Sequence, residues 1–153
     1  MKKRIRSSAG FTLIELLVAI SILAVLSTLV LANLNSARER GRDARRKSDL
    51  HQIKTALRLY YNDNQAYPVD SSNAIPDGAW GDEWKDEDTE TVYMSEVPDD
   101  PLPGVYSYYY YQDGTDDDSF ILIACLENKN DDAGIDTGCH DDCDDWCYII
   151  SAD

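Results

Sequence analysis

The chain has 153 residues, and its formal net charge of −15 at pH 7 is divided unevenly along the sequence. Residues 1–58 carry 12 Lys and Arg against four Asp and Glu, whereas residues 59–153 carry two Lys against 25 Asp and Glu. The acidic second part argues against nucleic-acid binding, which needs clustered Lys and Arg for phosphate contacts. The length allows one domain with a modest core.

An apolar run from Phe11 to Ala32 follows a short leader with four Lys and Arg. A helix of about 20 apolar residues crosses the hydrocarbon core of a membrane, and basic residues ahead of it predict that this end stays in the cytoplasm. A secretory signal peptide has a shorter apolar core, followed by a small-residue cleavage site. The run therefore indicates a membrane anchor. It contains one charged residue, Glu15, which needs a partner because a carboxylate in a bilayer costs roughly 3 kcal/mol.

The junction of the leader and the apolar run reads GFTLIEL, from Gly10 to Leu16. This string, between a basic leader and an apolar helix, resembles the class III signal of type IV pilins and type II secretion pseudopilins. The resemblance implies that a membrane prepilin peptidase cuts between Gly10 and Phe11, that Phe11 is N-methylated, and that the apolar helix stays in the mature protein. Gly10 suits such a cut because it has no side chain to hinder the protease.

Cleavage would also give Glu15 a partner, because it creates a new amine on Phe11. This amine lies about one helical turn from residue 15, or within reach of Glu15 on a neighbouring subunit. An ammonium and a carboxylate attract strongly where the dielectric constant is low, whereas an unpaired charge there is unfavourable. We therefore expect Phe11 and Glu15 to act together in assembly. The residues leave open whether they pair within one subunit or between two.

Apolar residues continue with helical spacing beyond the basic segment, at Leu50, Ile53, Leu57 and Tyr60. This spacing predicts one long helix over about 11–61. Residues 11–33 would form the transmembrane or filament-core part, and residues 34–61 would form an amphipathic part that packs on a head. Two interpretations of the basic cluster Arg38–Lys47 stay open. It forms a solvated collar, or it pairs with acidic surfaces of neighbouring subunits.

Residues 62–153 are expected to form an acidic globular head. The segment YYNDNQAYP, from Tyr60 to Pro68, ends the long helix and resembles the major pseudopilin pattern at the same place. Residues 69–98 are rich in Pro, Gly and acids, which predicts a long loop with one short helical turn, pinned to the head by Trp80 and Trp84. Strands are predicted at Val105–Tyr111, Ser119–Leu126 and Trp146–Ser151. The fold class is therefore α+β, with a small antiparallel sheet against the second half of the long helix.

Four cysteines stand near the end of the chain, at Cys125, Cys139, Cys143 and Cys147. A head outside the cytoplasm permits disulfides, and four cysteines allow three pairings, among which the sequence does not choose. A zinc site within CHDDCDDWC is the alternative, but the spacing fits no common zinc module. We expect disulfides.

The loop between residues 126 and 146 is rich in Asp, Asn and Gly, whose oxygens suit Ca²⁺. It does not follow the EF-hand pattern. Major pseudopilins bind calcium in the loop between their last strands, so the resemblance implies candidate ligands in Asp132, Asp136, Asp141 and Asp144. The alternative is a solvated acidic loop held by disulfides. Calcium is thus a candidate ligand, and no cofactor is required.

Two functions from different classes follow from these observations. The first is a structural subunit of a type IV pilus or type II secretion pseudopilus. It would be held in the inner membrane by one span, with its N-terminus cytoplasmic and its head extracytoplasmic, and then extracted into a helical filament of identical subunits. The resemblance implies as partners a prepilin peptidase and N-methyltransferase, an inner-membrane platform protein and an assembly ATPase.

The second function is a membrane-anchored extracytoplasmic protein whose acidic head binds calcium or a cationic ligand. An enzyme is not expected. His51 and His140 are far apart in the sequence, and no nucleophile motif accompanies either of them.

Overall fold

A computed structural model describes most of the chain. It covers residues 10–70, 72, 74–75, 80–86, 89–112, 116–144 and 146–152, and for residues 29–33 it describes the helical backbone without the side chains. The chain divides into two compact units, residues 1–38 and residues 39–153, and each is described by itself.

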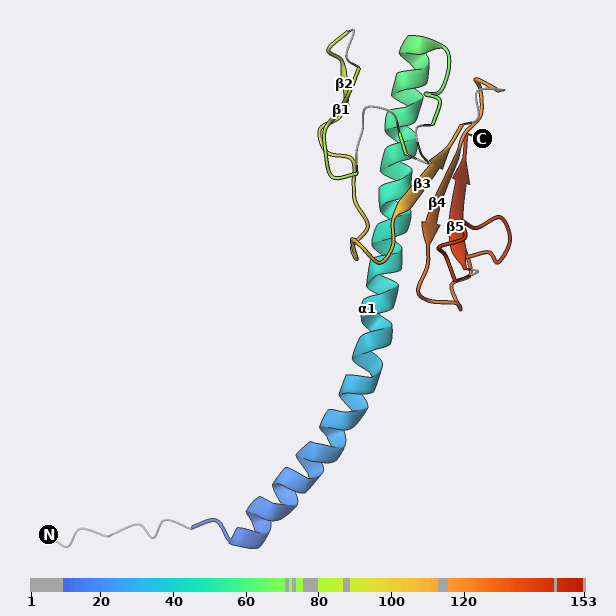
Figure 1. The fold of residues 1–153 in the computed structure, drawn as a ribbon. Coiled ribbons are helices and arrows are strands. Elements are labelled where there is room, and N and C mark those ends of the chain that lie inside the picture. Colours follow the sequence, from blue (N-terminus) through green and yellow to red (C-terminus); the bar gives the residue numbers. More distant parts are fainter. Residues whose placement is uncertain are drawn as a thin grey trace, which may run out of the picture. The chain divides into compact units, whose positions relative to one another are not determined.

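The first unit consists of the start of helix α1, which spans Leu13–Asn64 (Figure 1). Thr12 caps this helix, because its hydroxyl accepts the backbone N–H of Glu15 at 3.3 Å and its own N–H donates to Glu15 Oε2 at 2.9 Å. The two contacts form a capping box. Within the part of the chain that the structure describes, no helix combines the length and the hydropathy that a membrane span requires.

The second unit combines the later part of α1 with a three-stranded antiparallel sheet in the order β3-β4-β5 (Figure 1). The strands are β3 (Tyr108–Tyr111), β4 (Ile121–Cys125) and β5 (Cys147–Ser151). All three predicted strands exist, each shorter than expected. The α+β fold class is therefore confirmed.

The inner face of the sheet packs on α1. Leu50, Ile53 and Leu57 are fully buried, and they belong to one apolar cluster with the alternating residues Tyr108 and Tyr110 of β3. The helix contributes residues three or four apart and the strand contributes alternate residues, as expected for one face of a helix packed on one face of a sheet. The α1 helix ends beyond it at Asn64, where Gln65 takes a left-handed conformation and its N–H donates to the Tyr61 carbonyl at 2.7 Å.

The segment 69–98 differs from the predicted loop. It contains a two-stranded antiparallel sheet of β1 (Trp84–Lys85) and β2 (Val92–Met94), and none of its described residues forms a helical turn. Strands of two and three residues are too short to show a period in the sequence. The anchoring tryptophans are confirmed, because Trp84 stacks on Tyr60 of α1 at 5.5 Å between ring centroids and Trp80 meets Tyr108 edge-on at 5.8 Å.

Candidate functional site

The predicted cleavage point lies on an accessible segment ahead of α1. Gly10 is exposed, and among the described residues no atom beyond its chain neighbours lies within 4 Å of the position that a Cβ would occupy there. Phe11 is 87% exposed. A protease can therefore approach the bond between Gly10 and Phe11. The leader, residues 1–9, lies outside the described residues.

Glu15 is held on its own helix turn by Thr12. One carboxylate oxygen, Oε2, accepts from the Thr12 N–H at 2.9 Å and from the Thr12 hydroxyl at 2.7 Å. Within the described part of the chain, no residue donates a hydrogen bond to the other oxygen, Oε1. Glu15 therefore has one oxygen in the capping box and one available for a donor from elsewhere.

The helix around Glu15 exposes apolar side chains on every side. Eleven large apolar residues between positions 11 and 26 are at least half exposed: Phe11, Leu13, Ile14, Leu16, Leu17, Val18, Ile20, Ile22, Leu23, Val25 and Leu26. A shallow groove beside Glu15 is lined by Phe11, Ile14, Val18, Ala19 and Ile22. A helix that is apolar all round requires an apolar environment or other helices around it.

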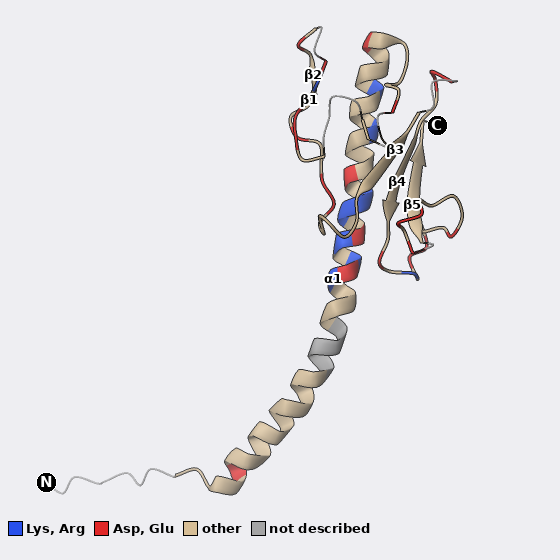
Figure 2. Ribbon diagram, viewed as in Figure 1, with Lys and Arg blue, Asp and Glu red and all other residues tan. Residues whose placement is uncertain are grey.

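Basic residues follow on α1, and Figure 2 shows them concentrated where the helix enters the second unit. Neither interpretation offered by the sequence, a solvated collar or pairing with neighbouring subunits, describes all of them. Arg42, Arg46 and Lys47 form ion pairs within the head. Arg38 and Arg40 are exposed.

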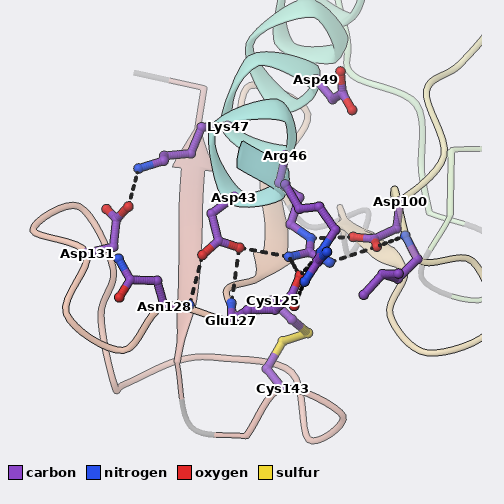
Figure 3. Close-up of polar contacts among 12 residues, drawn as sticks. Asp43, Arg46, Lys47, Asp49, Asp100, Cys125, Glu127, Asn128, Asp131 and Cys143 are labelled. Atoms are coloured by element: carbon purple, nitrogen blue, oxygen red, sulfur yellow. Dashed lines mark hydrogen bonds and ion pairs between the residues drawn. A yellow bond between two sulfur atoms is a disulfide. The ribbon is translucent and has the colours of Figure 1, made fainter. Parts of the chain in front are cut away.

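Arg46 is the centre of a buried ion-pair cluster (Figure 3). Its guanidinium donates to both carboxylate oxygens of Asp100, at 2.7 Å and 2.9 Å, to Asp43 at 2.7 Å and to Glu127 at 2.6 Å. The side chains of Arg46, Asp43 and Asp100 are completely inaccessible to solvent. The cluster joins α1 to the loop before β3 through Asp100. Through Glu127 it also joins α1 to the segment just after β4.

Asp43, seen in Figure 3, and Arg42 complete this connection. The Asp43 carboxylate accepts the backbone N–H groups of Glu127 at 3.1 Å and Asn128 at 2.8 Å. Arg42 donates to both oxygens of Glu127, at 2.7 Å and 2.5 Å, and these hydrogen bonds lower the pKa of Glu127 below its usual range. Lys47 donates to Asp131 at 2.6 Å and lowers the pKa of that carboxyl in the same way. The start of the loop after β4 is thus fixed to the helix by charge.

The cysteines form two disulfides, Cys125–Cys143 and Cys139–Cys147. This pairing selects one of the three arrangements, and it rules out the zinc alternative because no thiolate is left among the four. The bonds fix the loop over the outer face of the sheet. There His140 stacks on Tyr109 at 3.7 Å, and the Tyr109 hydroxyl donates to Asp142 at 2.9 Å.

The four expected calcium ligands are exposed and are not brought together. Among the described residues, no three His, Cys, Asp or Glu side chains form a group that could hold a metal ion. Asp132, Asp136, Asp141 and Asp144 all belong to this described part of the loop. The side chains as placed therefore do not form a calcium site, and calcium stays a candidate ligand.

The Arg46 cluster is the main feature that the sequence interpretation missed. Asp100 lies 54 residues and Glu127 lies 81 residues from Arg46, so no local pattern identifies them as partners. The one local signal is the spacing of three between Asp43 and Arg46, which places both on the same helix face.

The chain is similar to several known proteins. Residues 5–31 match the family described as the prokaryotic N-terminal methylation motif. The type II secretion system core protein G of Vibrio cholerae is 29% identical over 138 residues, which cover 89% of this chain and 94% of that protein. The protein of the same name from Pseudomonas aeruginosa is 31% identical over 105 residues, covering 67% and 74%. That of Klebsiella pneumoniae is 34% identical over 99 residues, covering 63% and 71%. No solved structure gives a significant match.

Proposed function

The chain belongs to the family of type II secretion system core protein G, the major pseudopilin, and on this premise we propose that it polymerises into a pseudopilus through its apolar N-terminal helix. The observation that carries the proposal is the combination of an accessible Gly10–Phe11 bond with a helix whose apolar side chains are exposed on all sides. Such a helix is stable in water only when other apolar surfaces cover it.

The first step is processing by a prepilin peptidase and N-methyltransferase. It removes residues 1–10 and leaves a methylated amine on Phe11. The match to the N-terminal methylation motif over residues 5–31 supports this step. The exposure of Gly10 and Phe11 supports it as well, because the protease must reach the backbone between them.

The second step is pairing of Glu15 with the Phe11 amine of a neighbouring subunit. The capping box already satisfies one Glu15 oxygen within its own chain, through Thr12. The second oxygen is then available to the ammonium group of the next subunit. Assembly buries this pair among apolar helices, where attraction between opposite charges is much stronger than in water.

The location follows from the same segment. Before assembly the protein is inserted in the inner membrane by residues 11–33, with its N-terminus cytoplasmic and its head outside the cytoplasm. The basic leader supports this orientation. The two disulfides support it too, because such bonds persist in oxidising compartments. A platform protein and an assembly ATPase supply the work that extracts the helix from the membrane.

Neighbouring subunits also attract each other through charged residues on the part of α1 that follows the apolar run. Arg38 and Arg40 are exposed, while the head carries the excess of Asp and Glu. In a parallel bundle of helices these two arginines face the acidic heads of neighbouring subunits. The attraction is screened by salt, as for any exposed charges.

The intact mass of the membrane-extracted protein tests the proposal. We expect the loss of residues 1–10 together with one added methyl group on Phe11. A Gly10→Leu variant is the control, because its bulky side chain blocks the cut and the chain keeps its full mass. An uncut wild-type chain in cells that contain a prepilin peptidase would contradict the proposed function.

A further inference from the structure

The four cysteines form one cluster on the outer face of the sheet, and their two disulfides interleave along the sequence. Cys125 on β4 and Cys147 on β5 are direct partners in the antiparallel register. Each of them is bonded to a residue of the intervening loop, Cys125 to Cys143 and Cys147 to Cys139. The two bonds are therefore neighbours in space.

The four cysteine residues differ in accessibility. Cys125, Cys143 and Cys147 are 1%, 3% and 0% exposed, whereas Cys139 lies at the edge of the cluster and is only partly buried. Thiol–disulfide exchange needs a thiolate to reach a disulfide sulfur. In the folded head Cys139 is therefore the cysteine that an external thiolate approaches most readily.

We propose that Cys139 is the entry site for thiol–disulfide exchange with the active-site cysteine of a thiol oxidoreductase, and that Cys147 relays the exchange to the buried disulfide. The external thiolate attacks Cys139 Sγ, forms a mixed disulfide and releases Cys147 as a thiolate. That thiolate attacks Cys125 Sγ, forms a Cys125–Cys147 bond and releases Cys143. The Cys143 thiolate then attacks Cys139, forms Cys139–Cys143 and releases the external thiolate unchanged.

The register makes the relay step feasible. Directly opposed residues of antiparallel strands have Cα atoms about 4.5–5.5 Å apart, which lies within the range of about 4.4–6.8 Å that a disulfide spans. A Cys125–Cys147 bond therefore forms without moving β4 and β5 apart. The three exchange steps consume no oxidant or reductant, because each disulfide bond that is broken is replaced by one that forms.

The same route explains how the interleaved pairs arise. Loop closure favours short separations, and Cys139–Cys143 closes a shorter loop than the 18-residue separation of Cys125–Cys143. Oxidation during export thus favours pairs other than the final ones. Exchange through Cys139, run in the reverse direction, converts such pairs into the final arrangement.

Reduced glutathione is the probe that tests this inference on the full chain in detergent, without oxygen. Samples are quenched with acid, alkylated and digested with a protease that cuts before Asp, since Asp136, Asp141 and Asp144 separate successive cysteines. We expect the first glutathione adduct on Cys139, followed by peptides that contain a Cys125–Cys147 bond. A first adduct on Cys125, Cys143 or Cys147, or no adduct on Cys139, would overturn the proposal.

Two double variants separate the relay from direct attack. In Cys139→Ser/Cys147→Ser, the Cys125–Cys143 bond should open at least tenfold more slowly than in the wild type. In Cys125→Ser/Cys143→Ser, the adduct on Cys139 should form at the wild-type rate. Opening of Cys125–Cys143 at the wild-type rate in the first variant would contradict the relay. The wild-type time course decides the entry site even where a variant does not fold.

Discussion

Arg46 and Asp100 are 54 residues apart in the sequence, yet the guanidinium of Arg46 donates to both carboxylate oxygens of Asp100, at 2.7 Å and 2.9 Å, with both side chains fully buried. This pair joins α1 to the loop that leads into β3. Because Asp43 and Glu127 also accept from Arg46, a single cation connects three segments of the head.

Replacement of Arg46 should therefore destabilise the head strongly. Arg46→Met removes the cation and leaves buried carboxylates without a partner, a change that typically costs about 3–5 kcal/mol. Urea unfolding followed by the fluorescence of the buried Trp84 measures the loss. Arg40→Met, an exposed site on the same helix, is the matched control and should change the free energy of unfolding by less than about 0.5 kcal/mol. Equal effects of the two substitutions would show that the cluster does not hold the head.

Glu127 should make stability depend on pH in the acidic range. Hydrogen bonds from Arg42 lower its pKa in the folded state, so its contribution is fully present above the unfolded value of about 4.3. The contribution is lost as the pH falls through the lowered folded pKa. Glu127→Gln should cost about 2 kcal/mol at pH 7 and much less at pH 3, measured by urea unfolding. An equal cost at both pH values would mean that the charge of Glu127 is not what stabilises the head.

Arg38 and Arg40 should affect assembly without affecting the fold. Arg38→Glu/Arg40→Glu places negative charge next to the acidic heads of neighbouring subunits. We expect an unchanged unfolding midpoint and a filament yield several-fold lower than that of the wild type. This loss of yield should be smaller at high salt, because screening weakens the repulsion. Arg38→Gln/Arg40→Gln is the intermediate control. Wild-type filament yield for the Glu variant at low salt would exclude a contact between these arginines and acidic heads.

Removal of calcium should leave the stability of the head unchanged. The carboxylates of Asp132, Asp136, Asp141 and Asp144 are exposed and, among the described residues, do not form a group that could hold a metal ion. The disulfides and the Lys47–Asp131 pair already fix the loop. Thermal unfolding of the protein in Ca²⁺ and in a chelator should give the same midpoint. A midpoint several degrees higher in Ca²⁺ would show that the loop rearranges to bind the ion.

The sequence allowed prediction of the features that repeat or lie close together along the chain. The motif from Gly10 to Leu16 is contiguous, and the spacing of Leu50, Ile53 and Leu57 identifies the buried face of α1. The aromatic and β-branched runs identify the strands of the main sheet. These elements depend on local preference and period, which a single sequence displays.

The rest depends on contacts between distant residues. The disulfide pairing depends on how the loop after β4 folds back onto the sheet, where Cys143 meets Cys125 and Cys139 meets Cys147. The partners of Arg46 depend on the approach of two separate segments, which carry Asp100 and Glu127, to α1. The basic cluster Arg38–Lys47 on α1 is an example. Arg40 and Arg42 are only two residues apart, yet Arg40 is exposed whereas Arg42 is paired with Glu127. Only the packed structure distinguishes the arginine that stabilises the head from the one that stays exposed.

We propose that subunits polymerise through pairing of Glu15 with the Phe11 amine, and the Glu15→Leu variant tests this pairing most directly. Filament yield is counted by electron microscopy, while the mass of the membrane-extracted protein shows whether residues 1–10 were removed. Glu39→Leu on the same helix is the control. We predict that Glu15→Leu is inserted and cut like the wild type and gives at least tenfold fewer filaments. Normal filaments from a correctly cut Glu15→Leu chain would contradict the account.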